Sequence, residues 1–386
     1  MAISLRRFHF TTISDLLFVE IMIAIAVSLL NPIWSLYFYE FLGNKSLVGL
    51  FSSLLSIVAL ISFFIFTPVI QKFSEKKIYL YGLIAGIILL NLISFNSNFY
   101  LFIILITVYM MTGVLRVESF GIMYRDSSKT KYLGKNEGLI YTISNVGWIV
   151  GSFLVIFLLK IYNLNKIFLV SAMFFLLALI VFSFYKGKPH KKVEENINLW
   201  SNFKGFFKKR ELRRLYFSSF GTALWLGTIF VYMPLYIVES GHSRSAVGTF
   251  VFIFLLPHLI QYFIGRQSDK VGTKLFMNLG YLIIGVFTLL TFFAKDLSLL
   301  IFLLFLANFG VSMILPTKEI HFFKSITKKE EEKYYGVYLT YNEVGLLLGK
   351  LIPALLLFVL PLRTIFLIIG ALMLVFYFFS MSLKHT

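Results

Sequence analysis

The 386-residue chain contains no cysteine and few charged residues. Disulfide bridges, thiolate metal sites and a cysteine nucleophile are therefore excluded. Asp, Glu, Lys and Arg make up only 14% of the residues, whereas a soluble domain carries about 25%. Phosphate-binding loops, dinucleotide fingerprints, zinc motifs and serine-nucleophile motifs are also missing from the sequence. We expect no cofactor, no bound metal ion and no enzymatic activity.

Long apolar runs take the place of the missing charge. Hydrophobic residues make up 59% of the chain, and its mean hydropathy is +0.85. A helix needs about 20 apolar residues to cross roughly 30 Å of hydrocarbon, and these runs are too long and too uniform for barrel strands. The sequence therefore predicts an all-α membrane protein with twelve transmembrane helices. The spans are expected at residues 13–40, 46–70, 77–96, 99–123, 136–160, 166–185, 212–238, 245–265, 274–294, 297–320, 334–359 and 363–382.

Positive charge is distributed unevenly between the predicted loops. An even number of spans places both termini on one side, where the loops carry 27 Lys and Arg residues, against 6 on the other side. Because cytoplasmic loops are enriched in Lys and Arg, we predict cytoplasmic termini and a location in the cell membrane, meaning an inner or plasma membrane. The net charge of +18 is attributed to these loops, and no nucleic acid partner is expected.

A basic segment divides the chain into two halves. Residues 1–186 and 212–386 each hold six predicted spans, and residues 187–211 connect them. Apolar residues recur at helical spacing in this connection, which favours a short helix lying at the lipid surface. A solvated basic loop is the alternative. The apolar positions are Ile197, Trp200, Phe203 and Phe207.

The two halves also repeat each other. The stretch from Glu40 to Phe51 matches residues 239–250 at an offset of 199, with the same Glu, Ser, Val, Gly and Phe positions. Gly147 and Gly151 likewise recur as Gly345 and Gly349. Glycines four residues apart let two helices approach closely. Duplicated halves with a pathway between them are typical of secondary transporters.

The loop after the eighth predicted span reads Gly265-Arg-Gln-Ser-Asp269-Lys270-Val-Gly272. It resembles the signature loop of the major facilitator superfamily, although the matching loop after the second span keeps only the basic residues. The resemblance implies two pseudo-symmetric six-helix bundles and a loop that acts as a conformational latch. A plain tight turn is the alternative. The predicted latch consists of Gly265, Asp269, Lys270 and Gly272, with Arg125 and Asp126 as partners.

Ionisable residues inside predicted spans are costly in hydrocarbon and mark candidate sites. In the family, spans 1, 4, 7 and 10 line a central cavity, and drug/proton antiporters often use a span-1 acid and a span-4 arginine. The glycines of span 5 resemble part of a motif of that antiporter branch. The resemblance implies that Glu20 and Arg116 meet and exchange a proton, whereas a purely structural ion pair is the alternative. The proton-coupling candidates are Glu20, Arg116, Glu118 and Glu343; Lys318 is interpreted as an interfacial residue.

Aromatic and polar residues on the inner-facing spans are candidates for solute contact. Aromatic rings bind apolar groups by stacking and cations through their π faces. A single histidine in a span is more often a packing residue than a ligand. The predicted cavity residues are Trp34, Tyr37, Asn145, Trp225, Tyr232, Tyr236, His258 and Asn308.

These patterns favour a secondary transporter that moves small solutes by alternating access, and the family resemblance implies a monomer. Its expected partners are a small-molecule substrate, protons and membrane lipids. The hypothesis that fits the two buried acids and the apolar pathway is proton-coupled efflux of amphipathic or cationic compounds. A proton-coupled sugar or nucleoside symporter, a lipid flippase of the same fold and a membrane receptor that transports nothing are the alternatives.

Overall fold

The computed structural model describes residues 12–127, 133–187 and 199–384. Within these ranges the chain is helical, without strands, and twelve helical segments are long and apolar enough to cross a membrane. The predicted all-α fold with twelve spans is confirmed. The first half contains α1 (Thr12–Leu42), α2 (Lys45–Lys72), α3 (Glu75–Phe95), α4 (Phe99–Ser127), α5 (Leu133–Ile161) and α6 (Leu164–Ser183).

The second half follows a short connecting helix, α7 (Leu199–Lys208). Its eighth span is divided into three segments, and its ninth span ends in a short 3₁₀ turn, η3 (Thr291–Phe293). The other elements are α8 (Arg210–Glu239), α9 (Arg244–Leu255), η2 (Leu256–Ile260), α10 (Gln261–Val271), α11 (Thr273–Leu290), α12 (Leu297–Lys324), α13 (Lys328–Leu356) and α14 (Leu362–Ser380).

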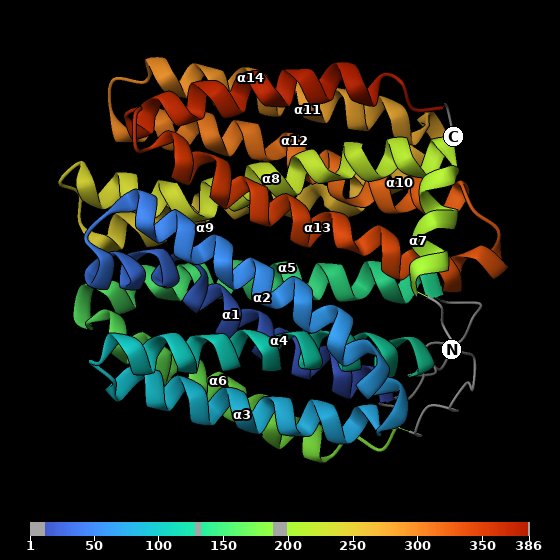
Figure 1. Cartoon of the computed structure of the whole chain (residues 1–386), viewed down its shortest axis with the longest axis horizontal. Helices are drawn as coiled ribbons and strands as arrows, with labels where there is room; N and C mark the ends of the chain where they lie inside the picture. The colour runs from blue at the N-terminus through green and yellow to red at the C-terminus, as the bar shows by residue number, and fades with distance from the viewer. Residues whose placement is uncertain (1–11, 128–132, 188–198, 385–386) are drawn as a thin grey trace, which may run out of the picture.

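The helices run roughly parallel and form two groups, which occupy the lower and upper parts of Figure 1. In the first group α1 packs on α5 and α6, and α3 packs on α4 and α6. In the second group α8 packs on α13 and α14, and α11 packs on α12 and α14. The groups join through two repeat-related contacts, α2 with α13 and α5 with α9. The exact limits of the two units, residues 186 and 212, stay a prediction.

Small residues set the closest helix contacts, and the repeat places them at equivalent positions. Gly147 of α5 lies against Ala24 of α1, and its repeat partner Gly345 of α13 lies against Ala223 of α8. A side chain at Gly349 would overlap the carbonyl oxygen of Leu224. The paired glycines therefore act in helix packing, which is the physical effect expected of their spacing.

Replacing Gly349 by alanine is expected to destabilise the protein by about 1–3 kcal/mol, because the added methyl group forces α8 and α13 apart. Gly336 provides a matched control in the same helix, since a Cβ there meets nothing within 4 Å. Thermal unfolding in detergent should therefore show a lower midpoint for Gly349→Ala and an unchanged or higher one for Gly336→Ala. Equal midpoints would contradict this packing account.

Helix α7 attaches the connecting segment to the second half. Phe206 is fully buried against Tyr216 and Tyr334, whereas Trp200 is 74% exposed. Lys209 forms a salt bridge with Glu330 at the start of α13. The hydrogen bond from Lys209 lowers the pKa of the Glu330 carboxyl. This bond therefore contributes stability at neutral pH and loses it as the pH falls through that lowered pKa. The position of α7 at a lipid surface stays a prediction.

Candidate functional site

Two ion pairs connect the halves at the end of the bundle opposite α7 and the last described residues, which we call the distal face. Lys45 of the first half lies 2.6 Å from Glu239 of the second. Arg244 of the second half lies 2.6 Å from Glu40 of the first. The four residues are two sets of repeat partners, so the pairs are related by the internal symmetry. Each pair is partly exposed, and such pairs contribute only about 0–1 kcal/mol each.

Closer contacts continue from the distal face toward the middle of the bundle. Gly248 of α9 lies directly against the backbone of Ile156 in α5. Deeper in the interface, the Lys350 ammonium of α13 donates a 2.7 Å hydrogen bond to the Ser56 hydroxyl of α2. The Tyr232 hydroxyl donates to the Lys350 carbonyl oxygen over 2.6 Å. The halves are therefore closed against each other on the distal side.

Glu20 lies on α1, about 9 Å along the helix from Ser14. The hydroxyl of Ser144 on α5 donates a hydrogen bond to its carboxylate. The carboxylate is only half-buried and also interacts electrostatically with Arg116. Among the described side chains no salt bridge joins Glu20 to Arg116 directly. Glu20 is thus an acid within a predicted span whose carboxylate accepts a hydrogen bond from the neutral hydroxyl of Ser144.

Arg116 instead lies within the first half. Its guanidinium carbon is 4.7 Å from the centre of the Phe175 ring of α6, and the residue is 7% exposed. Close contact with Gly82 of α3 leaves room for the base of the side chain. Glu118 is half-buried nearby on α4. The proton-coupling roles of Arg116 and Glu118 stay predictions.

Glu343 is half-buried on α13, where the neighbouring Asn342 amide donates a 3.0 Å hydrogen bond to its carboxylate. Lys350, two turns further along α13, interacts electrostatically with it. Lys350 also donates a hydrogen bond to Ser56 across the interface between the halves. A change in the charge of Glu343 therefore changes the electrostatic attraction on a group that joins the two halves. The role of Glu343 in proton coupling stays a prediction.

The predicted aromatic cavity residues lie mainly inside the two halves. Trp34 contacts Phe168 with ring centres 5.0 Å apart. Tyr37 is 2% exposed and donates to the Asn96 carbonyl oxygen. Trp225 is fully buried and donates to the Thr288 hydroxyl over 2.9 Å. Tyr232 is also fully buried, and Tyr236 is half-buried against Phe366. Their contact with a solute stays a prediction.

The predicted polar residues gather at the broken eighth span. The Asn308 amide of α12 donates to the carbonyl oxygen of Phe254, and His258 lies within interaction distance of Asn308. The Asn145 amide of α5 donates a 2.9 Å hydrogen bond to Gln261. This bond joins the two halves at the point where η2 meets α10. Residues from spans 5, 8 and 10 therefore form one polar cluster.

The loop that resembles the family signature is a sharp turn between α10 and α11. Gly272 has φ of 97°, a backbone conformation that favours glycine. Gly265 lies on α10 near Pro316, and Lys270 is exposed. The side chains of Asp269, Arg125 and Asp126 lie outside the part of the chain that the structure describes. The predicted latch contact between them stays a prediction.

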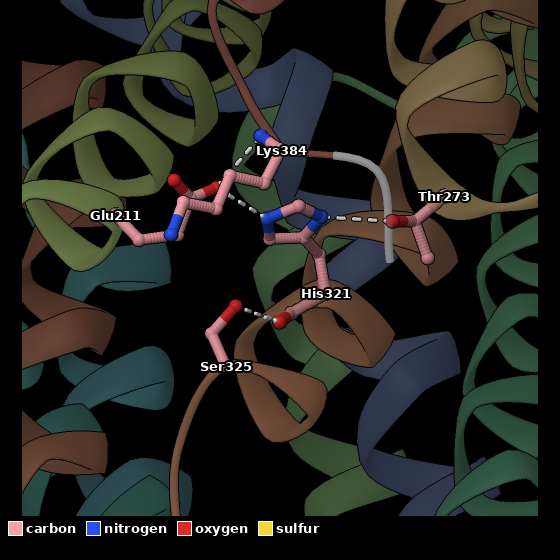
Figure 2. A network of polar contacts seen from close by, with 5 residues as sticks. All are labelled: Glu211, Thr273, His321, Ser325 and Lys384. Atoms are coloured by element: carbon pink, nitrogen blue, oxygen red, sulfur yellow. Dashed lines mark hydrogen bonds and ion pairs between the residues drawn. The ribbon is translucent and has the colours of Figure 1, made fainter.

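A polar network anchors this turn to the rest of the second half (Figure 2). Thr273, directly after Gly272, is hydrogen-bonded to Nδ1 of His321 over 2.8 Å. Nε2 of His321 lies 3.0 Å from the Glu211 carboxylate. The backbone N–H of Lys384 donates to the same carboxylate over 3.0 Å. The network thus links α8, α11, α12 and the segment after α14.

Two residues of this region add to the sequence-based interpretation. Lys318 is only 3% exposed, and its ammonium lies 4.3 Å from the ring centre of Tyr341, so protein groups enclose it; its position at the lipid interface stays a prediction. Gln261 was not among the predicted site residues, although it bridges the halves. Its position three residues after His258, on the same helix face, is the sequence signal that indicates it.

Twelve spans in two repeat-related halves of the same topology, with polar groups buried between them, define a secondary transporter built from parallel repeats. The sequence matches the profile of the Major Facilitator Superfamily over residues 16–260 and again over 215–385. The chain belongs to this superfamily, as the resemblance of its signature loop implied.

Curated relatives match only part of the chain. An uncharacterized MFS-type transporter of Methanocaldococcus jannaschii is 25% identical over 226 residues, which are 57% of this chain and 56% of that protein. The quinolone resistance protein NorA of Staphylococcus aureus is 27% identical over 103 residues, or 26% of each chain. The chain thus spans about half of the first relative and about a quarter of the second.

Solved structures match along nearly the whole chain. The nucleoside transporter NupG gives a TM-score of 0.79 at 14% identity, covering 96% of this chain and 99% of that one. A POT family transporter in complex with a thioalcohol-conjugated peptide gives 0.76 at 13% identity, covering 95% and 94%. At these identities the likeness establishes the fold alone.

Proposed function

We propose that this transporter exports amphipathic or cationic compounds in exchange for protons. The observation that carries the proposal is Glu20, a half-buried carboxylate inside a span, hydrogen-bonded by Ser144 and within the electrostatic reach of Arg116. The partial match to a quinolone resistance protein supports export of this class of compound. The exchange takes place by alternating access within a monomer.

The chemistry of a carboxyl group explains how one site serves both protons and solutes. A charged Glu20 attracts a cation, whereas a protonated Glu20 does not. Binding of one species therefore favours release of the other. Ser144 offers a hydrogen bond to either form, and because it lies on α5, it connects this choice to a helix that contacts the second half. A change at Glu20 thereby biases the equilibrium between two arrangements of the halves.

The proposed orientation places the termini in the cytoplasm and the distal face outside the cell. A cysteine introduced at exposed Ser243, between the distal ends of α8 and α9, is expected to react with a membrane-impermeant maleimide in intact cells. A cysteine at exposed Gln267, near the opposite end of α10, is expected to react only after permeabilisation. The native chain has no cysteine, so each label is unique. The reverse pattern would place the termini outside.

A second candidate function, proton-coupled uptake of a neutral polar nutrient, is favoured by one observation. The cluster of Asn145, His258, Gln261 and Asn308 supplies uncharged hydrogen-bonding groups in the middle of the bundle. Direction distinguishes the two functions: export requires that solute and proton move oppositely, whereas nutrient uptake requires that they move together.

Proteoliposomes with an acidic interior provide the test. Purified protein is expected to accumulate ethidium, a flat amphipathic cation, inside such vesicles while protons leave. A protonophore should abolish this accumulation, and protein-free vesicles supply the background. Accumulation that requires an alkaline interior would support symport instead. Ethidium uptake that is the same with and without a pH gradient would contradict proton coupling.

A further inference from the structure

The eighth span is interrupted at mid-length by its own sequence. Helix α9 ends at Leu255, a 3₁₀ turn covers Leu256–Ile260, and α10 begins at Gln261. Pro257 has no N–H group, so it cannot donate to the carbonyl that an α-helix would offer it. That carbonyl, of Ile253, accepts the Leu256 N–H instead. Non-helical backbone at membrane depth is tolerated where protein groups or a cavity satisfy it.

Asn308 of α12 meets this break and leaves one of its atoms without a partner. Its amide nitrogen donates to the Phe254 carbonyl oxygen at the end of α9. The residue is fully buried, and within the described part of the chain its Oδ1 has no hydrogen-bond partner. The Nε2 atoms of His258 and Gln261 are buried in the same way, again counting only described residues. Buried polar atoms are almost always paired. His258 lies within interaction distance of Asn308, but no hydrogen bond of normal geometry from a described residue satisfies any of the three atoms, so the break has room in its hydrogen bonding for a further partner.

Aromatic rings lie beside these polar atoms. Phe254, one turn before His258, stacks on Trp225 with ring centres 5.6 Å apart and an interplanar angle of 23°. Phe230 packs edge-on against Phe254, and Trp148 of the first half contacts Phe230. The break thus combines flat apolar surfaces with uncharged donors and acceptors.

The interface between the halves indicates which chemical group fits there. Asn145 of the first half donates its side-chain amide to Gln261. In this distal-closed arrangement an amide group, that of Asn145, therefore already binds one member of the polar cluster. Movement of the halves relative to each other would break this hydrogen bond and leave the Gln261 side-chain carbonyl oxygen without its present donor.

We propose that His258, Gln261 and Asn308 form a subsite for a neutral, planar group that carries a hydrogen-bond donor beside an acceptor, such as an amide, lactam or pyrimidine edge of the transported solute. Asn308 Oδ1 accepts, Gln261 Nε2 donates, and His258 Nε2 does either according to its tautomer. The inference rests on the proposed function only in that the protein transports a solute through the space between its halves.

Matched probe pairs test this subsite by equilibrium dialysis with the purified protein at one fixed pH. Uridine and nicotinamide carry a donor beside an acceptor, whereas 3-methyluridine and N,N-dimethylnicotinamide keep the ring but lose the donor. Wild-type protein is expected to bind at least one N–H probe, and its methylated partner about tenfold more weakly. Asn308→Leu should abolish this preference, because it removes the acceptor for the N–H group. Gln261→Leu should weaken the binding of both members of a pair, because it removes the donor to the carbonyl group that they share.

Asn91→Leu is the matched control, because among the described residues the Asn91 amide donates only to the Ile87 carbonyl oxygen within its own helix. The preference should survive in this variant. Size-exclusion chromatography confirms that each variant is folded, and the weakened binding of both probes by Gln261→Leu is the test if Asn308→Leu does not fold. Binding of neither probe pair, equal binding within both pairs, a preference that survives in folded Asn308→Leu, or wild-type affinity in folded Gln261→Leu would overturn the proposal. The same measurement in Glu20→Gln separates the hypotheses, because the preference should persist there even where proton coupling is lost.

Discussion

Cross-linking the two halves at the distal face is expected to stop transport. Cysteines in place of Lys45 and Glu239, whose charged groups lie 2.6 Å apart, would be joined by a short bifunctional thiol reagent. Alternating access requires these faces to separate once in each cycle. Ethidium uptake into proteoliposomes should therefore fall in proportion to the cross-linked fraction, and approach zero when cross-linking is complete. A reagent with a cleavable disulfide allows activity to be restored by reduction.

A pair within one half controls for the chemistry of the reagent. Ser94 and Asn163 both lie near the distal face and both belong to the first half. Joining cysteines at these two positions should leave uptake unchanged, because the six helices of the first half move together. The repeat-related pair, Glu40→Cys with Arg244→Cys, should reproduce the inhibition. Full activity in completely cross-linked protein would exclude a rocking motion that opens the distal face.

Replacing Glu20 by glutamine is expected to separate solute movement from proton movement. Glutamine keeps the shape and an acceptor for the Ser144 hydroxyl, but it cannot take up or release a proton. For a one-to-one electroneutral exchange, a pH difference of about one unit sustains about tenfold accumulation of solute. Wild-type protein should approach this value. Glu20→Gln should give no accumulation and only a weakened exchange of labelled for unlabelled ethidium, because the cation loses its charged partner.

Two further variants make the measurement specific to Glu20. Asp296→Asn is a carboxylate-to-amide change outside the spans, where Asp296 accepts a 2.8 Å hydrogen bond from the Leu299 N–H at the start of α12. It should accumulate ethidium like the wild type. Glu343→Gln tests the second acid in the same assay. If only Glu343→Gln loses accumulation, the proton site lies on α13, and the mechanism proposed for α1 is wrong.

The fold could be predicted from the sequence because hydrocarbon imposes a simple rule on it. Each span must be an apolar run of sufficient length, and the runs are separated by charged or turn-forming residues. The predicted span 46–70 corresponds to α2 at Lys45–Lys72, and the predicted span 334–359 corresponds to α13 at Lys328–Leu356. The repeat could also be read, because Gly49 and Gly248 hold equivalent positions and both form close contacts between the halves.

The orientation of side chains could not be predicted in the same way. A span that is apolar on all sides gives no periodic signal that distinguishes its faces. The sequence assigns Trp34 and Tyr37 to the cavity, and the structure adds that they pack on Phe168 within the first half; their contact with a solute stays a prediction. The ion pairs between Glu40 and Arg244 and between Lys45 and Glu239 were missed for a related reason. They depend on how the two halves pack against each other, which the local sequence around each residue does not indicate.

The polar cluster was found only in part. His258 and Asn308 stand out in the sequence because each is a polar residue within an apolar run. Gln261 lies near the expected end of its span, where polar side chains are ordinary. The structure changes this interpretation, since α10 continues to Val271 and places Gln261 opposite Asn145.

Proton movement triggered by solute, in liposomes that hold purified wild-type protein and an internal pH-sensitive dye, tests the central claim most directly. No pH gradient is imposed, and ethidium is added outside. Exchange of a cation for a proton through Glu20 predicts that the interior becomes more alkaline as ethidium enters, and that Glu20→Gln and protein-free liposomes show no change. Entry of ethidium without any change in internal pH would contradict proton-coupled exchange and would leave a uniporter on the same twelve-helix fold.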